Sequence, residues 1–257
     1  VYKRQRIYNG FGKAEPEDKL IYGPNIKDWP EMVALTDNLM LKVASVIHDP
    51  VTTTDELIPS GETSSYRSNP LGLAEFTLSR KDPEYVGRAK AIQKVERVRE
   101  AGECMGEADP NMKTAMHKVK EMFPDACGSN TGVGSTIFAV KPGDGSAREQ
   151  AASCQKVLGG WANIAKEYAT KRYRSNLINW GMLPLLSKDR FEVNDVIIMP
   201  DVKTRLIAQN SFSAYLVRNG AVKRITLDMD TITLTERDII LAGSLINYYA
   251  ESAKKED

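Results

Sequence analysis

The side chains with the clearest chemical potential lie in the segment KPGDGSAREQAA, residues 141–152. Ser146 offers a hydroxyl, and Arg148 offers a permanently charged fork of donors that matches a carboxylate. Gly143 and Gly145 let the backbone turn sharply and bring its N–H groups close to a ligand. Since a helix N-terminus carries unpaired N–H groups and the positive end of the helix dipole, the segment predicts an anion-binding site.

The same segment also has a purely structural interpretation. Ser146 followed three residues later by Glu149 is the pattern of a capping box at a helix start, with Arg148 on the surface. No Lys-Ser or Lys-Thr pair follows the glycines, so the segment is not a phosphate-binding Walker loop. No GxGxxG pattern is present either, which excludes the dinucleotide fingerprint. The residues alone leave the catalytic and the structural interpretation open.

A second pair of candidates lies in a stretch rich in Thr, Ser, Gly and Pro, residues 51–72, which we expect to be a long loop. Asp55 and Arg67 place a carboxylate and a guanidinium in this loop. Loop residues of this kind are commonly solvated, so the pair carries little weight alone.

Cysteine and histidine usage limits the chemistry further. The three cysteines, Cys104, Cys127 and Cys154, form no CxxC pair and no zinc pattern. With only His48 and His117, the chain offers neither an HExxH site nor a histidine-based triad. We therefore predict no metal site within this chain.

Periodicity indicates the elements that position these residues. Apolar spacing predicts helices over 84–101, 111–123 and about 147–158, the last following a buried strand at 135–140. Residues 160–181 are expected to form a short strand and a helix. Asn219-Gly220 between two alternating runs predicts a β-hairpin, and a closing helix is expected to be capped at Thr235 or nearby. Residues 31–48 mix helical and strand signals, and the class is α/β or α+β.

Composition excludes several classes of protein. The 257 residues are 42% hydrophobic and 27% charged, as in an ordinary globular protein of one large or two small domains. A net charge of +1 creates no global field for nucleic acid or anionic membrane, and no apolar run is long enough to span a bilayer. The N-terminal segment is basic without an apolar core, so it is not a signal peptide. Because the first residue is Val1, we expect a fragment or a processed chain.

Several motifs occur together in a familiar order. They are GPNIK (23–27), TTTDELIPSG (52–61), SYRSNPLG (65–72), DGSARE (144–149), LGG (158–160) and SNLINWGMLPL (175–185). In this order they resemble the C-terminal domain of the aconitase superfamily. The resemblance implies a domain over 23–257, preceded by a lead-in at 1–22 from a missing upstream region.

The resemblance implies an α/β fold, the swivelling β/β/α domain that closes over a shared active site. The other half of that site carries a [4Fe–4S] cluster on three cysteines, in a region absent from this sequence. Cys104, Cys127 and Cys154 do not stand at its ligand positions, so we expect this chain to bind no cluster and to be inactive alone.

The resemblance also assigns roles to individual residues. Ser146 matches the serine base that takes a proton from the substrate carbon, which requires N–H donors and a nearby arginine to stabilise the alkoxide. Arg148 and Arg67 match arginines that bind substrate carboxylates, with Gly145 and Ala147 beside them in the substrate-binding loop. Asp55 matches an aspartate of the hydrogen-bond network of the site.

Two positions depart from the family pattern. Ala147 replaces a second serine, and Glu56 replaces the histidine that usually follows the aspartate. Losing a buried hydrogen bond to substrate typically costs about 0.5–1.5 kcal/mol, which is enough to change substrate preference.

The resemblance therefore predicts a lyase that dehydrates and rehydrates a hydroxy di- or tricarboxylate of the citrate/isocitrate type, the reaction of the tricarboxylic acid cycle. The partners would be the cluster-binding domains and the substrate. A stand-alone small subunit of an isopropylmalate-isomerase-like hetero-oligomer is the alternative. An RNA-binding regulator is a further one, which the net charge of +1 disfavours. The expected compartment is the cytoplasm, with the mitochondrial matrix left open.

Overall fold

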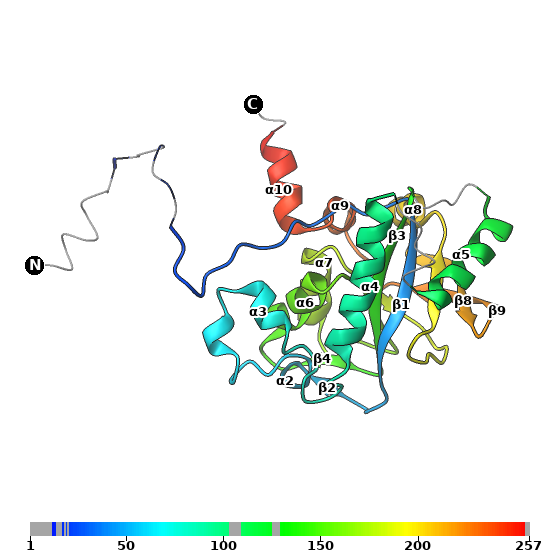
Figure 1. Cartoon of the computed structure of the whole chain (residues 1–257), viewed down its shortest axis with the longest axis horizontal. Helices are drawn as coiled ribbons and strands as arrows, with labels where there is room; N and C mark the ends of the chain where they lie inside the picture. Colours follow the sequence, from blue (N-terminus) through cyan, green and yellow to red (C-terminus); the bar gives the residue numbers. More distant parts are fainter. Residues whose placement is uncertain are drawn as a thin grey trace, which may run out of the picture.

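A computed structural model describes residues 12–13, 17, 19, 21–102, 109–124 and 129–254. Cys104 and Cys127 lie outside these residues, as does most of the expected lead-in. From residue 21 to residue 37 the chain forms no helix or strand, and it runs along the outside of the molecule toward β1 (Figure 1).

Seven strands form a closed barrel in the order β1-β3-β5-β6-β9-β8-β7. Strands β1, β3, β5 and β6 run parallel to one another, and β7, β8 and β9 pair antiparallel. A single residue pair between β6 and β9, Leu186 with Asp228, closes the ring. The strands are β1 (Asn38–Ile47), β3 (Thr131–Ala139), β5 (Gly160–Ala165), β6 (Leu183–Leu186), β7 (Val196–Met199), β8 (Ser211–Arg218) and β9 (Ala221–Asp228).

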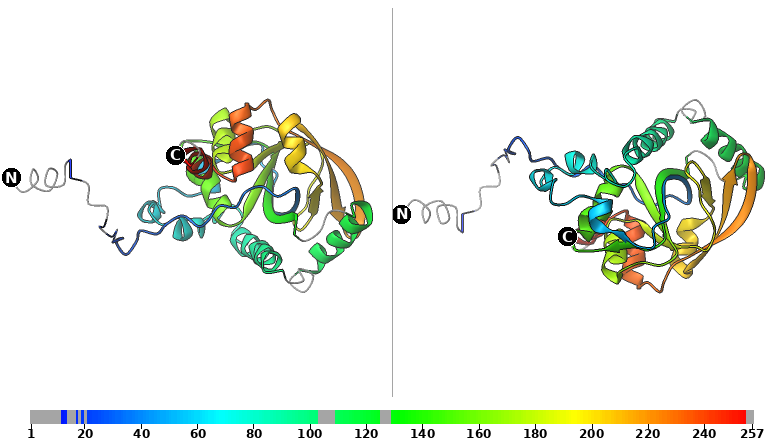
Figure 2. Two further views of the ribbon diagram at one scale, coloured as in Figure 1. Left: turned by 90° about the horizontal axis from the view of Figure 1, so that it is seen from above. Right: turned by 90° about the horizontal axis from the view of Figure 1, so that it is seen from below.

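Helices cover the barrel on two sides. Figure 2 shows α4 and α5 together on one side of the strands, and α8 and α9 on the other. The longer helices within the described residues are α4 (Tyr85–Glu100), α5 (Pro110–Met122), α6 (Arg148–Val157), α7 (Lys171–Asn179), α8 (Val202–Ala208), α9 (Leu234–Ala242) and α10 (Leu245–Ala253). The mixed α/β class expected from the sequence is confirmed.

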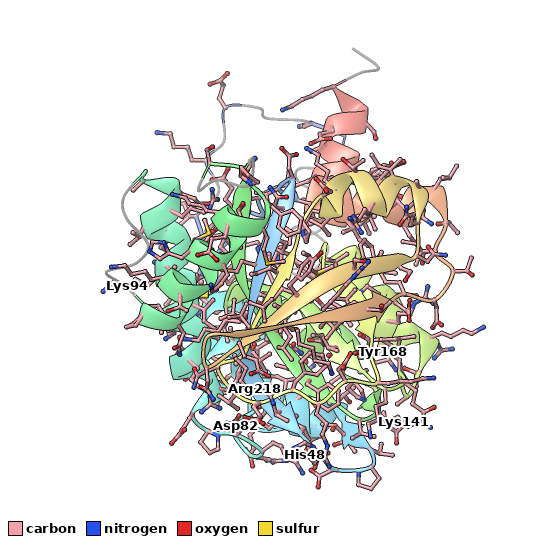
Figure 3. The ribbon with its side chains drawn as sticks, turned by 90° about the vertical axis from the view of Figure 1, so that its right-hand side faces the viewer. His48, Asp82, Lys94, Lys141, Tyr168 and Arg218 are labelled. Atoms are coloured by element: carbon pink, nitrogen blue, oxygen red, sulfur yellow. The ribbon has the colours of Figure 1, made fainter. Side chains whose placement is uncertain are left out.

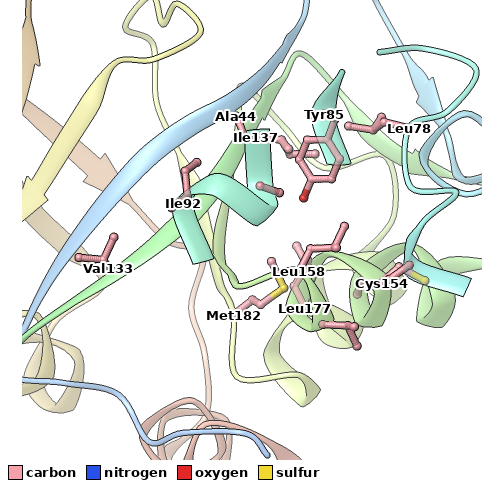
Figure 4. Close-up of a cluster of buried hydrophobic side chains, with 14 of the residues drawn as sticks. Ala44, Leu78, Tyr85, Ile92, Val133, Ile137, Cys154, Leu158, Leu177 and Met182 are labelled. Atoms are coloured by element: carbon pink, nitrogen blue, oxygen red, sulfur yellow. The ribbon is translucent and has the colours of Figure 1, made fainter. Parts of the chain in front are cut away.

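The first strand is buried on both faces. Leu39, Leu41 and Val43 pack with α8, α9 and the antiparallel strands, whereas Met40 and Ala44 pack against α4 and α6. Figure 4 shows part of the cluster that contains Met40 and Ala44, in which Ala44 packs with apolar side chains from elements far apart in the chain. A strand buried on both faces has no apolar–polar alternation, which explains why residues 31–48 carried a mixed signal.

Elsewhere, some of the elements predicted from local sequence patterns are confirmed and others differ. The helices expected over 84–101 and 111–123 are confirmed as α4 and α5, and the hairpin turns at Asn219 and Gly220 with φ of 50° and 78°. The closing helix is instead two helices, because Gly243 breaks it with φ of 87°. Its N-cap is Thr233, two residues before the expected position.

Residues 51–72 are not the single long loop that composition indicated. They contain the short elements β2 (Thr52–Thr53), α2 (Thr54–Leu57), a 3₁₀ turn (Ser64–Tyr66) and α3 (Pro70–Ala74). Outside the barrel, β2 pairs with the three-residue strand β4 (Pro142–Asp144). Each of these elements is short, so single-sequence periodicity has too few residues to detect it.

The doubly packed core yields a stability prediction. Ile197 in β7 is fully buried, so Ile197→Ala should lower the free energy of unfolding by about 2–5 kcal/mol through lost burial and a residual cavity. Urea titration followed by circular dichroism measures this value. The control is Ile207→Ala in α8, where the side chain is 58% exposed and the change should stay within about 0.5 kcal/mol. Equal losses in the two variants would contradict the assignment of the core.

Candidate functional site

The candidate site lies beyond the carboxyl ends of the parallel strands. In an α/β sheet, loops that follow parallel strands meet at one edge, and ligands commonly bind there. Figure 3 shows His48 and Lys141, which come just after β1 and β3, at the same end of the molecule. The segment with Ser146 begins directly after Lys141, so β3 delivers it to this edge.

Pairing between β2 and β4 joins the two segments singled out in the sequence. Thr52 pairs with Pro142 and Thr53 with Asp144 in parallel. The contact continues at Gly145, whose φ is +132° and where a Cβ atom would lie 2.2 Å from Oγ1 of Thr54. Any larger residue would therefore collide with the start of α2. Helix α2, which carries Asp55, and the loop of Ser146 thus lie against each other.

The turn before Ser146 is held from the other side by α7. Gly143 has φ of +97°, and a Cβ atom there would lie 2.3 Å from the ring of Tyr173. Thr170 caps α7 by accepting from the N–H of Tyr173, and its hydroxyl donates to the Gly143 carbonyl at 3.2 Å. A glycine is required here because the aromatic ring fills the space of a side chain.

Buried amides in turn hold Tyr173. Its hydroxyl oxygen accepts from Nε2 of Gln155 at 3.0 Å and from Nδ2 of Asn163 at 2.7 Å. Burial raises the pKa of Tyr173, against the smaller opposing effect of these hydrogen bonds, so the phenol stays protonated. Sequence reasoning missed Thr170 and Tyr173. The available signal was a threonine just before a helix, the usual N-cap position.

The predicted capping box at Ser146 is wrong. Helix α6 starts at Arg148 with Ala147 as its N-cap, and no side chain caps it. Glu149 instead accepts a hydrogen bond at 3.1 Å from Nε1 of Trp180 in the loop after α7. Ser146 is exposed just ahead of the helix, and the N–H groups of the first turn are left without a side-chain acceptor. The structural interpretation of Ser146 therefore loses its support, and the anion site stays a prediction.

The two arginines differ in their surroundings. Nε of Arg148 is buried and has no hydrogen-bond partner within the described part of the chain. Arg67 is exposed two residues before Asn69, the N-cap of α3, and α3 packs against α6. The packing of α3 on α6 thus brings the segment of Arg67 toward the helix that begins with Arg148.

Asp55 is part of an ion-pair network that the sequence did not reveal. Its carboxylate pairs with Arg80, and Arg80 also pairs with Glu62 at 2.6 Å. The side chains of Asp55 and Arg80 are about half exposed, at 54% and 45%. Arg80 therefore orients Asp55 at the edge of the site without burying it. In the sequence, the two adjacent basic residues Arg80 and Lys81 are the only hint of these ion pairs.

Glu56 serves α2 as a capping residue. Thr53 and Glu56 form a reciprocal capping box, in which the backbone N–H of Thr53 donates to Oε2 of Glu56 at 2.7 Å. Lys81 donates to Oε1 at 3.2 Å. Burial alone would raise the pKa of Glu56, but the hydrogen bonds from Thr53 and Lys81 together lower it. The carboxylate that replaces the usual histidine is thus occupied within the chain.

The described residues do not fit an iron–sulfur cluster. Among them, no group of three or more His, Cys, Asp and Glu side chains could hold a metal ion. Cys154 is buried on α6 within the apolar cluster of Figure 4. Burial, followed by the charge of Glu149, raises the pKa of its thiol to about 12, which disfavours the thiolate that iron requires.

In the part of the chain that the structure describes, no helix is long and apolar enough to cross a membrane.

Comparison with known proteins finds relatives of the aconitase type. The family model described as the aconitase C-terminal domain matches residues 88–190. The homoaconitase small subunit of Methanocaldococcus jannaschii is 32% identical over 149 residues, which cover 58% of this chain and 72% of that subunit. Aconitate hydratase A of Rickettsia bellii is 31% identical over 132 residues, covering 48% of this chain and only 15% of that enzyme.

A solved structure was also found. The 3-isopropylmalate dehydratase of Methanocaldococcus jannaschii matches 85% of this chain and 97% of its own, with a TM-score of 0.49 and 24% identity. At this level of similarity it adds no argument to the sequence relatives.

The capping role of Glu56 predicts a pH-dependent stability. A carboxyl whose pKa is lowered on folding contributes stability that is present above its unfolded pKa of about 4.3 and lost as the pH falls through its folded value. Glu56→Ala should therefore lower the free energy of unfolding at pH 7 by about 1 kcal/mol, typical of a lost cap, and this difference should shrink toward pH 3. Urea titrations at both pH values test it. Glu251→Ala, an exposed site in α10, is the control, and a pH-independent difference for Glu56→Ala would contradict the argument.

Proposed function

The chain belongs to the aconitase superfamily as a C-terminal or small-subunit domain, and from this premise we propose that it supplies half of a hydro-lyase active site. Its substrate is a hydroxy di- or tricarboxylate, and a larger cluster-binding subunit supplies the other half. The observation that carries the proposal is the β2–β4 pairing, which brings the start of α2, with Asp55, against the loop of Ser146.

Ser146 is proposed as the base that removes a proton from the carbon next to a substrate carboxylate. A free serine hydroxyl is a poor base, because its alkoxide is too high in energy. The uncapped N–H groups at the start of α6, together with the positive end of the helix dipole, stabilise negative charge at this position. Because no side chain caps α6, the Ser146 hydroxyl is not engaged in capping the helix.

Arg148 and Arg67 are proposed to bind the substrate carboxylates. A guanidinium donates two parallel hydrogen bonds to a carboxylate, which orients the substrate as well as holding it. Support comes from the buried, unpartnered Nε of Arg148 within the described chain, because a buried donor without an acceptor costs stability unless a ligand completes it. Asp55, held by Arg80, is proposed to complete the polar network at the edge of the site.

The substrate is proposed to differ from the citrate/isocitrate pair. Ala147 offers no hydroxyl, and the carboxylate of Glu56 is occupied by Thr53 and Lys81. The match to this chain covers 72% of the homoaconitase small subunit but 15% of an aconitate hydratase. The first point favours a different substrate, and the match to a small subunit favours a small subunit that works with a separate large subunit. Any iron–sulfur cluster would then be held by the partner and would polarise the leaving hydroxyl there.

The arrangement is tested by purifying the native protein from its source under anaerobic conditions and measuring mass, iron and activity on a panel of hydroxy di- and tricarboxylates. Copurification with a separate, iron-containing subunit that is active on one of these compounds would support the proposal. Recovery of this sequence within one long iron-containing polypeptide would replace the small subunit with a fused domain. An iron-free protein without activity in any assembly would overturn the proposed function.

The role of Ser146 makes a direct prediction. Ser146→Ala in the assembled enzyme should lower kcat by at least 10³-fold, the scale for loss of a general base, while leaving the thermal unfolding midpoint within about 2 °C. Steady-state kinetics and calorimetry measure the two effects. Ser252→Ala on α10 is the matched control and should keep full activity. Retention of a tenth of the wild-type activity in Ser146→Ala would eliminate this residue as the base.

Substitution of Thr170, the N-cap of α7, distinguishes a role in positioning the site from a role in stability alone. Thr170→Val removes an N-cap and the hydrogen bond to Gly143, so it should cost about 1 kcal/mol and also lower kcat by misplacing Ser146. Thr233→Val removes the equivalent cap of α9 and should cost a similar amount of stability with kcat unchanged. Equal activities in the two variants would show that Thr170 stabilises the fold without positioning the site.

A further inference from the structure

A cavity lies at the opposite end of α6 from Ser146. Its volume is about 280 Å³, and it is bounded by α4, the last turn of α6, the glycine turn after it, and the segment at residues 30–33. Helix α6 has ten residues and is therefore about 15 Å long, so this cavity is separate from the candidate hydro-lyase site.

The cavity contains a buried amine. Lys156 is only 7% exposed, and its Nζ has no hydrogen-bond partner among the residues that the structure describes. The ammonium position lies 3.6 Å from the ring centroid of Trp161, and both side chains line the cavity. A lysine is almost never buried without a partner, because an ammonium loses its hydration there.

None of the described charged groups that line the cavity forms a hydrogen bond with Nζ of Lys156. Those that line it are Glu31 from the N-terminal segment and Glu96, Arg97 and Glu100 from α4. Both carboxylate oxygens of Glu96 accept from Arg99 at 2.7 Å, and one of them also accepts from the N–H of Val133 at 2.8 Å. Desolvation therefore dominates and lowers the pKa of Lys156 to about 7.

A neutral buried amine in a cavity is a nucleophile. At neutral pH the unprotonated form of Lys156 is therefore far more populated than that of an ordinary exposed lysine, whose pKa is about 10.4. Lysines desolvated in apolar pockets attack carbonyl groups to form Schiff bases.

We propose that this cavity is a binding site for a small 2-oxo acid, which Lys156 holds as a Schiff base. Arg97 on the rim would receive the carboxylate, and its guanidinium donates a long hydrogen bond of 3.5 Å to Oε1 of Gln93. The inference does not depend on the proposed hydro-lyase function, since it uses a different end of the helix.

The chemistry is balanced without an oxidant or a reductant. The lone pair of Nζ forms a C–N bond to the carbonyl carbon, and a proton moves from nitrogen to the carbonyl oxygen to give a carbinolamine. Loss of water then takes the remaining amine proton and leaves a C=N bond. When this imine is protonated, the cation lies over the face of Trp161, as the ammonium of Lys156 does, and the ring stabilises either positive charge.

The test uses the complete chain at pH 7 with glyoxylate as the probe and sodium cyanoborohydride to reduce the iminium. Peptide mapping by mass spectrometry should find Lys156 labelled at least tenfold faster than Lys94, an exposed lysine of α4 that points away from the molecule in Figure 3. Lys156→Arg should abolish this fast label, whereas Lys94→Arg should retain it. Circular dichroism checks that both variants are folded.

A second variant tests the carboxylate contact. Arg97→Gln should raise the glyoxylate concentration for half-maximal labelling at least fivefold, and labelling by acetaldehyde, which has no carboxylate, should stay unchanged. Labelling of Lys156 at the rate of Lys94, or labelling that never saturates with glyoxylate, would overturn the proposal. An equal effect of Arg97→Gln on both aldehydes would overturn the assignment to 2-oxo acids.

Discussion

The two-residue strand β2 organises the candidate site through its parallel pairing with β4. Without this contact the loop of Asp55 and the loop of Ser146 would be two polar surface segments, some ninety residues apart in sequence. The close approach of Gly145 to Thr54 extends the pairing into the start of α2. Hydrogen bonds between so few residues are weak alone, so the barrel beneath must hold the two segments in register.

The barrel provides this support because its central strands are packed from both faces. β3 is buried throughout and β1 at every residue but Val46, between the apolar side chains of α8 and α9 on one face and those of α4 and α6 on the other. Such strands cannot shift by one residue without moving every side chain into the wrong cluster. The carboxyl ends of the parallel strands are therefore placed reproducibly, and the polar loops that follow them inherit that placement.

Helix α6 relates the site to the rest of the molecule. Its N-terminus lacks a capping side chain where negative charge is expected to bind, and its C-terminal turn carries a lysine that burial keeps from being fully charged. Between them lie Cys154 and Gln155, which tie the helix to the apolar cluster and to Tyr173. The middle of the helix thus supplies stability, and each end leaves a polar group without a partner in the described chain.

Local sequence determined the features that depend on neighbouring residues. The Asn219-Gly220 turn needs two positive φ values, and the helix over 84–101 needs only its own apolar spacing, so both could be read directly. The order of short motifs likewise identified the family, because each motif keeps its residues whether or not the fold is known.

Tertiary structure alone decided which partners these residues meet. The capping box expected at Ser146 is absent because α6 starts at Arg148 with Ala147 as its N-cap. Glu149 bonds instead to Trp180, a contact that depends on how α6 and α7 pack. Arg80, Thr170 and Tyr173 reach the site only through the fold, and the burial of Lys156 results from α4 lying across the end of α6. Such contacts join residues distant in sequence, and a single sequence contains no local signal for them.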